Sequence, residues 1–350
     1  MTTIGCGPDK SLFVDVDDNL WVCGMDLFNK QEYYKVPTMV EGLPPIHSVA
    51  AFGVILLLDV EGYVWKVQES ELKKLTELPA IKSISSGNSH SLLLDVNGEV
   101  WGLGSNVHGQ LGIDSGEIFD EKVYLPTKIQ NVPAMQSICA AYNHSLLLDA
   151  EGRVWGSGTN ADSRMGLNET PKTATVIDID TKIHSFSAGW FHSLFLDVNH
   201  SVYTCGGNQM FQQGLDGHKI GKATKHTKLR GVRLVNGGQY HSMFVDMNDS
   251  VWICGRNFNG QLGTEPCPKL QLQQAEFFDS IPPIVSISSL FHSLFLDVEG
   301  NVWSCGKNVV GQLGLGCAND QVHIPTKIES MPRIKDPVAR KMRAKSARNI

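Results

Sequence analysis

One motif recurs seven times along this chain of 350 residues and fills most of it. Its most complete copies read HSLLLDVNGEVWGLGSNVHGQLG at 90–112 and HSLFLDVEGNVWSCGKNVVGQLG at 292–314. The aromatic residue near the centre of each copy recurs on average every 47 residues, at Trp21, Trp65, Trp101, Trp155, Tyr203, Trp252 and Trp303. A catalytic site occurs once in a chain, so a motif present in seven copies indicates a structural unit.

Each copy of the motif predicts a β-hairpin. In the last copy, residues 294–296 are a short apolar run typical of a buried strand, residues 297–300 supply a turn, and residues 301–305 resume as a second strand. Two further strands, represented by 81–87 and 126–129, complete the unit. A four-stranded blade buries both faces only between neighbouring blades. The sequence therefore predicts an all-β fold, a seven-bladed β-propeller.

The chain begins and ends at about the same point of the repeat. We therefore expect C-terminal strand residues (322–334) to complete the blade that holds residues 3–24. Pairing of the N- and C-terminal strands would close the ring and cover strand edges that otherwise invite aggregation. This predicts one propeller domain, residues 1–334, followed by a basic tail without regular structure, residues 335–350.

Charge is unevenly distributed along the chain. The net charge is −6, yet the tail holds six basic residues and one acid. The tail is a candidate import signal or nucleic-acid arm through Arg340, Lys341, Arg343, Lys345 and Arg348, and a solubilising role is the alternative. Because the remaining body is acidic, wrapping of DNA by the propeller itself is not expected.

The cysteines and the hydropathy pattern indicate the cellular compartment of the protein. No Cys-x-x-Cys pair occurs among the eight cysteines, which disfavours zinc, and we expect reduced structural thiols. No run approaches the roughly 18 apolar residues of a membrane helix. The first residues lack the charged and apolar zones of a signal peptide. We expect a cytoplasmic and/or nuclear protein without a membrane partner.

Five copies of the motif begin with a histidine, at His90, His144, His192, His241 and His292. One histidine per blade can bridge neighbouring strands, and buried polar groups need such partners, so these residues are predicted to be structural. The repeat aspartates, such as Asp297, are predicted turn formers. The Gly-Gln-Leu-Gly loops lack the Lys-Ser/Thr and the helix of a phosphate-binding loop. We expect no cofactor, no metal and no catalytic residue.

The motif resembles the repeat of the regulator of chromosome condensation family. The pattern His-Ser-Leu-x-Leu, then Gly-x-Val-Trp-x-x-Gly-x-Asn-x-x-Gly-Gln-Leu-Gly, is nearly complete at 90–112 and 292–314 and eroded at 11–24 and 55–65. The resemblance covers about residues 1–334 and implies a seven-bladed propeller. It leaves the function open, because fold alone does not set activity. Some members exchange nucleotide on the small GTPase Ran and bind nucleosomes, some serve ubiquitin ligases as binding modules, and one plant branch senses ultraviolet light through clustered tryptophans.

Partner specificity usually resides in variable loops on a rigid frame. Here the loop 113–124 is acidic and the loop 217–228 is basic, and both could equally be solvated linkers. The candidate partner-binding residues are Asp114, Glu117, Asp120, Glu121, Trp190, Lys219, Lys222, Lys225 and Lys228. Aromatic residues at or next to the position before a repeat histidine form either an apolar belt on one face or ordinary rim packing. They are Tyr142, Phe191, Tyr240 and Phe291.

These observations favour a non-catalytic protein-interaction platform that binds a protein partner through blade-end loops. The partner would be a small GTPase, the ubiquitin machinery or a chromatin protein. One alternative is a guanine-nucleotide exchange factor for a Ran-like small GTPase, for which the acidic loop 113–124 is the candidate wedge. The other is a chromatin- or nucleic-acid-associated protein that uses the basic tail.

Overall fold

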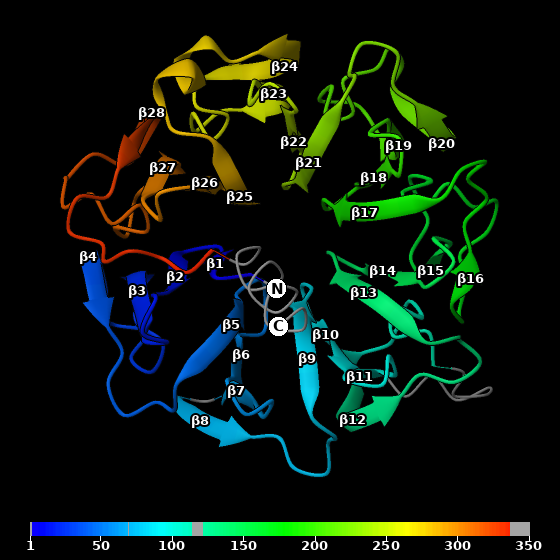
Figure 1. Cartoon of the computed structure of the whole chain (residues 1–350), viewed down its shortest axis with the longest axis horizontal. Helices are drawn as coiled ribbons and strands as arrows, with labels where there is room; N and C mark the ends of the chain where they lie inside the picture. Colours follow the sequence, from blue (N-terminus) through cyan, green and yellow to red (C-terminus); the bar gives the residue numbers. More distant parts are fainter. Residues whose placement is uncertain (1, 69, 114–121, 337–350) are drawn as a thin grey trace, which may run out of the picture.

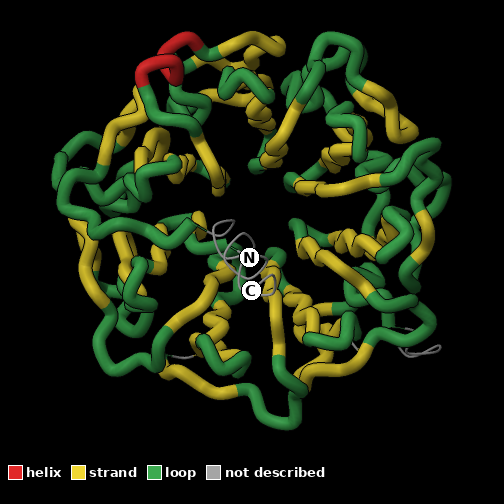
Figure 2. The backbone as a smooth tube through the Cα atoms, in the orientation of Figure 1, coloured by secondary structure: helices red, strands yellow, loops and turns green. Residues whose placement is uncertain are grey.

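The computed structural model describes residues 2–68, 70–113 and 122–336. They form seven four-stranded antiparallel sheets arranged as blades around a common axis (Figure 1). Each blade takes four consecutive strands, so that blade 1 is β1–β4 and blade 7 is β25–β28. The predicted all-β seven-bladed propeller is confirmed. Strands and loops alternate around the whole ring (Figure 2).

The strands fall into four concentric sets. The innermost strands are β1 (Ile4–Cys6), β5 (Ile46–Ala50), β9 (Ile81–Ser86), β13 (Met135–Ala140), β17 (Ile183–Ala188), β21 (Val232–Gly237) and β25 (Ile284–Ser289). The second strands are β2 (Lys10–Val14), β6 (Leu56–Asp59), β10 (His90–Asp95), β14 (His144–Asp149), β18 (His192–Asp197), β22 (His241–Asp246) and β26 (His292–Asp297).

The third strands are β3 (Leu20–Met25), β7 (Val64–Gln68), β11 (Val100–Ser105), β15 (Val154–Gly158), β19 (Val202–Gly207), β23 (Val251–Asn257) and β27 (Val302–Lys307). The outer strands are β4 (Tyr33–Met39), β8 (Glu71–Lys74), β12 (Lys122–Lys128), β16 (Thr175–Val176), β20 (Lys219–Lys225), β24 (Cys267–Gln274) and β28 (Gln321–Lys327). A short 3₁₀ helix, η1 (Glu276–Ser280), follows β24.

The repeat aspartate builds the turn between the second and third strands. In blade 7, Oδ1 of Asp297 accepts the backbone N–H groups of Glu299 and Asn301 at 2.9 Å each. Oδ2 of Asp297 accepts the indole N–H of Trp303 at 3.0 Å. The same indole bond occurs, at 2.8–3.3 Å, for Trp21, Trp65, Trp101, Trp155 and Trp252. In blade 5 the position of the repeat tryptophan is occupied by Tyr203, which is 6% exposed.

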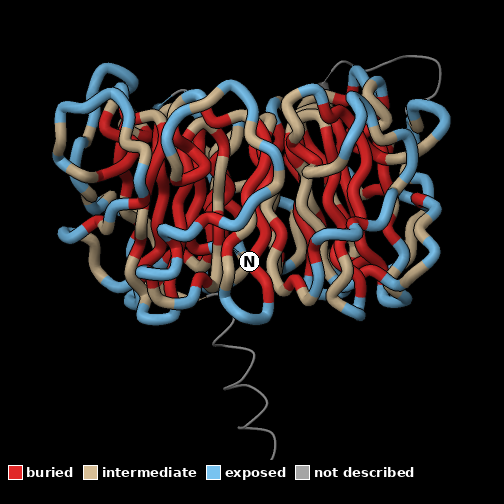
Figure 3. The backbone as a smooth tube through the Cα atoms, turned by 90° about the horizontal axis from the view of Figure 1, so that it is seen from above, coloured by how far each residue is buried: buried red, intermediate tan, exposed pale blue. Residues whose placement is uncertain are grey.

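The core lies between blades. Seven clusters of buried apolar side chains are found in the described part of the chain, and each one is built from two adjacent blades. The four fully buried phenylalanines among the described residues, Phe13, Phe195, Phe244 and Phe295, all lie on second strands. Figure 3 shows the buried residues as a band between two exposed loop faces. The seven clusters explain why a single blade could not fold alone.

The repeat histidines connect each blade to the next. Nε2 of His90 in blade 3 lies 2.9 Å from the hydroxyl of Ser145 in blade 4, and that hydroxyl donates to the main-chain carbonyl of Gln110 at 2.6 Å. Because the single hydroxyl proton is used on the carbonyl, the serine accepts from His90, which fixes the neutral tautomer with the proton on Nε2. The pairs His144–Ser193, His192–Ser242 and His292–Ser11 repeat this contact at 2.7–3.3 Å.

Burial keeps these imidazoles neutral. It lowers the pKa of His90, His192, His241 and His292 to about 3. For His144, burial first and the nearby Arg164 second hold the pKa well below its ordinary value. Of the five, His241 lacks a hydrogen-bond partner on either ring nitrogen within the described residues.

The ends of the chain meet differently from the sequence-based expectation. Blade 1 consists of β1–β4 alone, and β28 is the outer strand of blade 7. Residues 322–334 therefore supply no strand to the blade that holds residues 3–24. The ends contact each other through an isolated antiparallel bridge from Asp15 to Ile334, flanked by backbone hydrogen bonds of Arg333 and Lys335 to blade 1. The physical reason is that β28 is needed to cover blade 7, which leaves only a few following residues to reach blade 1.

Side-by-side packing completes the ring at this junction. One of the seven apolar clusters joins blade 7 to blade 1 and includes Phe13, Leu294 and Ile334. The pair His292–Ser11 lies at the same junction. The first and last blades thus contact each other through the same kinds of interaction that join the other blades.

Candidate functional site

Six aromatic rings meet where the inner strands of five blades end, and Trp190 lies at their centre. Its ring is stacked on Tyr142, with centroids 4.5 Å apart and planes at 24°. Phe52 and Phe291 approach it at 6.0 and 5.8 Å. Phe191 and Tyr240 lie at 6.3 and 6.4 Å from Trp190 and stack on each other at 4.8 Å. We call these six residues the Trp190 cluster; all are partly buried.

The repeat explains how the cluster forms. Each of its residues lies in the loop that follows an inner strand, and equivalent loops of a propeller converge at one end of the axis. The sequence singled out Trp190 and four of the other rings. It missed Phe52, because blade 2 has no repeat histidine from which to align the position. Its place directly after an inner strand, the place of the other five rings, was the signal in the sequence that could have identified Phe52.

Three cations surround the Trp190 cluster. Arg164 is only 4% exposed, donates from Nη1 to the carbonyl of Trp190 at 2.9 Å, and lies 5.0 Å from the ring of Phe191. Arg256 lies 5.7 Å from the ring of Tyr240. The ammonium of Lys307 lies 5.5 Å from the ring of Phe291. Cation–π contacts of this kind hold charges beside the rings, so the cluster presents apolar area with a positive border.

Asp162 balances the buried arginine. Its carboxylate accepts from Nη2 of Arg164 at 2.7 Å and is itself partly exposed. Burial lowers the pKa of Arg164, and the carboxylate of Asp162 opposes that shift. The ion pair therefore anchors Arg164 under the aromatic rings, while Arg256 and Lys307 keep partial exposure to solvent.

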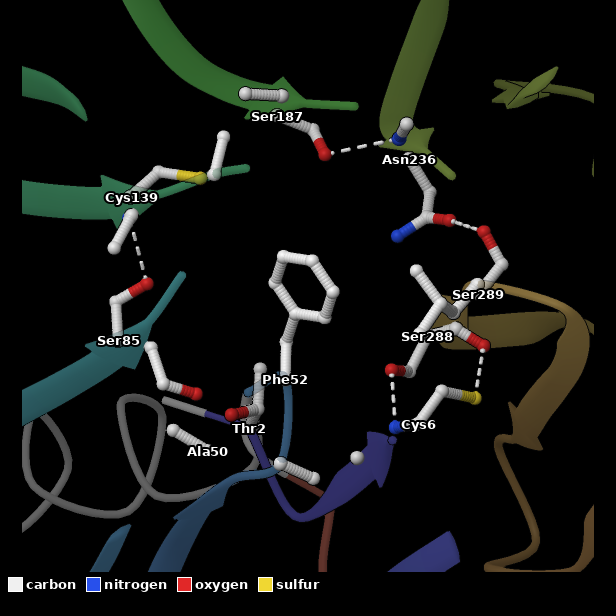
Figure 4. A pocket seen from close by; sticks show the side chains of 18 of the residues that line it. Thr2, Cys6, Ala50, Phe52, Ser85, Cys139, Ser187, Asn236, Ser288 and Ser289 are labelled. Atoms are coloured by element: carbon white, nitrogen blue, oxygen red, sulfur yellow. Dashed lines mark hydrogen bonds between the residues drawn. The ribbon is translucent and has the colours of Figure 1, made fainter. Parts of the chain in front are cut away.

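A cavity of about 430 Å³ lies along the axis beneath the cluster. Figure 4 shows the ring of Phe52 in this cavity with serines around it. The hydroxyls of Ser85, Ser187 and Ser288 each accept a backbone N–H from the next blade, at 2.8, 3.0 and 2.9 Å. The described residues that line the cavity include no charged side chain. The serines tie neighbouring inner strands together.

The cysteine thiols and the side chains that could bind a metal ion are scattered over the described part of the chain. All eight cysteines are free. Burial raises the pKa of Cys6 to about 12 and of Cys139 to about 11, which keeps both thiols protonated in the cavity wall. Over residues 2–68, 70–113 and 122–336, no group of three histidine, cysteine, aspartate or glutamate side chains is placed to hold a metal ion. No helix in these ranges is long and apolar enough to cross a membrane.

The structure separates the remaining candidate residues from Trp190. Lys219, Lys222 and Lys225 are exposed on the outer strand β20, and Lys228 follows them on the rim of blade 5. Two other predicted sites lie outside the described residues. They are the acidic loop residues Asp114, Glu117, Asp120 and Glu121 and the tail residues Arg340, Lys341, Arg343, Lys345 and Arg348.

Comparison with known proteins agrees with this architecture. A family model described as an RCC1-like domain matches residues 59–349, so the chain belongs to the RCC1-like domain family. Among curated relatives, the human Regulator of chromosome condensation is 27% identical over 297 residues, which cover 77% of this chain and 70% of the relative. The Ultraviolet-B receptor UVR8 of Arabidopsis thaliana is 27% identical over 266 residues, covering 72% of this chain and 58% of the receptor.

Solved structures show the same fold at low sequence identity. Prp20p from Saccharomyces cerevisiae superposes with a TM-score of 0.79 at 19% identity, covering 97% of both chains. Human WBSCR16 gives a TM-score of 0.75 at 21% identity, covering 86% of this chain and 85% of the other.

Proposed function

We propose that this protein is a non-catalytic interaction platform of the cytoplasm or nucleus, which binds a protein partner through the loops around Trp190. One observation carries the proposal: six rings from five blades gather at one end of the axis beside two partly exposed cations, Arg256 and Lys307. Aromatic and arginine side chains contribute most of the binding energy at protein interfaces, usually near the centre of the contact.

The charges around the Trp190 cluster indicate the chemistry of the partner. Arg256 and Lys307 border the rings, and Arg164 lies beneath them. A partner segment with an apolar or aromatic anchor flanked by carboxylates would contact the rings and the cations together. The neutral serine-lined cavity below adds no charge to this recognition.

Affinity capture with a matched control tests the proposal. Immobilised wild-type protein and the variants Trp190→Ala and Arg256→Glu should be compared with Tyr33→Ala, which removes an exposed ring on the outer strand β4. Partners captured by wild type and by Tyr33→Ala should be lost from the two cluster variants, with circular dichroism showing that all four proteins are folded. Equal capture by all four proteins would place the partner elsewhere.

Guanine-nucleotide exchange on a Ran-like GTPase is the second candidate. It is favoured by the relatives named Regulator of chromosome condensation and by the similar structure of Prp20p, a protein with binding properties to Gsp1p and histones. Release of a fluorescent guanine nucleotide from Ran at substoichiometric protein would support it. Charge reversal at Asp114, Glu117, Asp120 and Glu121 should then abolish release. Absence of release favours the platform.

A chromatin-associated role is the third candidate and concerns the basic tail beyond the propeller domain of residues 1–334. Salt-sensitive nucleosome binding that disappears when residues 336–350 are deleted would favour it.

A further inference from the structure

The outer strand of every propeller blade is a sheet edge, and most edges here are interrupted. Pro37, Pro126 and Pro325 occupy one register position in β4, β12 and β28, directly before a threonine that pairs with the third strand. The outer strands β8 and β16 are only 4 and 2 residues long. Proline and short length are common means of preventing an edge from pairing with another chain.

Strand β20 lacks both protections. It is 7 residues long, and Ala223 takes the register position of the prolines, since the next residue, Thr224, pairs with Thr204. Three sister blades accept a proline there, so the sheet does not need a backbone N–H at this position. In β20 this N–H is therefore not required by β19, and its nitrogen lies beside Gly166 of blade 4, where an added Cβ would come within 3.1 Å of it. Strand β24 also lacks this proline, but it has Pro268 near its start.

Charge distinguishes β20 from the other edges. Residues 217–231 hold five basic residues and no acidic residue. Lys219, Lys222 and Lys225 are exposed, and none of the eight ion pairs in the described part of the chain involves them. Lysines along an edge repel neutral and basic strands from pairing, because pairing would desolvate the ammonium groups. An acidic strand would gain from the same charges.

We infer that β20 is a docking edge for an extended, acidic segment of a partner protein, which adds to blade 5 as a fifth strand. Main-chain hydrogen bonds to the free edge would supply affinity, and alternate carboxylates beside the lysines would supply selectivity. A nucleic acid could use the charges but has no peptide backbone to pair with the edge. Strand β20 lies on the outer rim (Figure 1), whereas the residues of the Trp190 cluster follow the innermost strands.

The test uses the full chain and a fluorescein-labelled peptide of alternating glutamate and valine with the length of β20, followed by fluorescence polarisation. Ala223→Pro should weaken binding at least about tenfold without changing any charge, and Lys219→Glu with Lys222→Glu should do the same. Lys73→Glu with Lys74→Glu, an equal charge change on β8, should leave the affinity unchanged. The peptide N-methylated at alternate residues keeps every charge and should also bind at least about tenfold more weakly.

Three outcomes would overturn the inference. One is no binding of the peptide at concentrations up to about 1 mM. A second is loss of binding in the lysine variant while N-methylation has no effect, which would show charge attraction without strand pairing. A third is an oligothymidylate that binds more tightly than the peptide and responds to the same lysines. Because the N-methylated peptide tests pairing on the wild-type protein, the result does not depend on folding of Ala223→Pro.

Discussion

The imidazole Nε2 of His292 lies 2.7 Å from the hydroxyl of Ser11, although 281 positions separate the two residues. That hydroxyl also donates to the carbonyl of Gln312 at 2.7 Å. His90 and Ser145 make the same contact between blades 3 and 4. The junction that closes the ring is thus built with the same hydrogen bonds as a junction within the chain, and its strength can be compared directly with theirs.

Removal of the closing hydroxyl should destabilise the whole propeller. In Ser11→Ala, the buried Nε2–H of His292 and the carbonyl of Gln312 both lose a partner, and we expect a loss of about 1–3 kcal/mol in the free energy of unfolding. Urea titration followed by tryptophan fluorescence measures it. Ser145→Ala should cost a similar amount, whereas exposed Ser330→Ala should cost less than about 0.5 kcal/mol. A neutral Ser11→Ala would show that the ring does not depend on this contact.

Stability should fall steeply in mild acid. Burial lowers the pKa of four repeat histidines from 6.5 to about 3, so the unfolded chain binds more protons than the folded chain between these values. Their contribution is fully present above about pH 6.5 and is lost as the pH falls toward 3. Each histidine adds a slope of about 1.4 kcal/mol per pH unit in that window. Urea midpoints at pH 7.5, 6.5 and 5.5 measure the slope.

His241→Gln provides the comparison for this pH dependence, since its unfolding should take up about one proton fewer. A midpoint that stays constant between pH 7.5 and 5.5 would contradict the neutral state that burial imposes on the repeat histidines.

Gly238, three residues before His241, should tolerate no side chain, although Ala141 occupies the same position before His144. A Cβ on Gly238 would collide with the imidazole of His241, and its nearest neighbours are all atoms of that ring. Gly238→Ala should therefore cost about 1–3 kcal/mol. In the double variant with His241→Ala, the collision is gone, so the two losses should fall short of additivity by at least about 1 kcal/mol. Additive losses in thermal unfolding would show that the imidazole is not the obstacle.

The hydrogen bond from the repeat indole to the repeat aspartate should contribute more to stability than an aromatic ring at that position does without it. In Trp252→Phe, Oδ2 of the buried Asp246 loses its donor at 2.9 Å, and we expect a loss of about 1–3 kcal/mol. Tyr203→Phe should cost less, because Oδ2 of Asp197 accepts from the hydroxyl of Thr181 at 3.5 Å and not from the ring at position 203. Chemical denaturation of both variants decides the order. A larger loss in Tyr203→Phe would contradict the role given to the indole.

The buried thiols should be unreactive in the folded protein. Burial raises the pKa of Cys205, Cys254 and Cys305, whereas Cys267 and Cys317 are partly exposed. Alkylation at pH 8 followed by mass spectrometry should modify Cys267 and Cys317 first. Modification of Cys205 at the same rate would mean that the blades open readily.

Local pattern was enough to predict each repeat unit. The alternation around Asp297 and Trp303 reads as a hairpin, since turn chemistry and strand periodicity act over a few residues. The partner of each histidine could not be derived, because Ser145 lies one blade beyond His90 and the pairing depends on how the blades pack. The same limit explains the wrong expectation for residues 322–334, whose strand completes blade 7 and leaves the short segment 333–335 to contact blade 1.

For the candidate site, too, the sequence predicted some features and only the structure revealed the others. Trp190 and the lysines of β20 stand out in the sequence by residue type alone. That Phe52 and Arg164 join Trp190, while Lys222 lies apart on the rim, depends on distances between blades. The sequence by itself determined the number of repeats, the strands and the turns, because these follow from short-range periodicity. Only the tertiary structure decided which side chains from different blades meet, because those contacts depend on the three-dimensional packing of the blades around one axis.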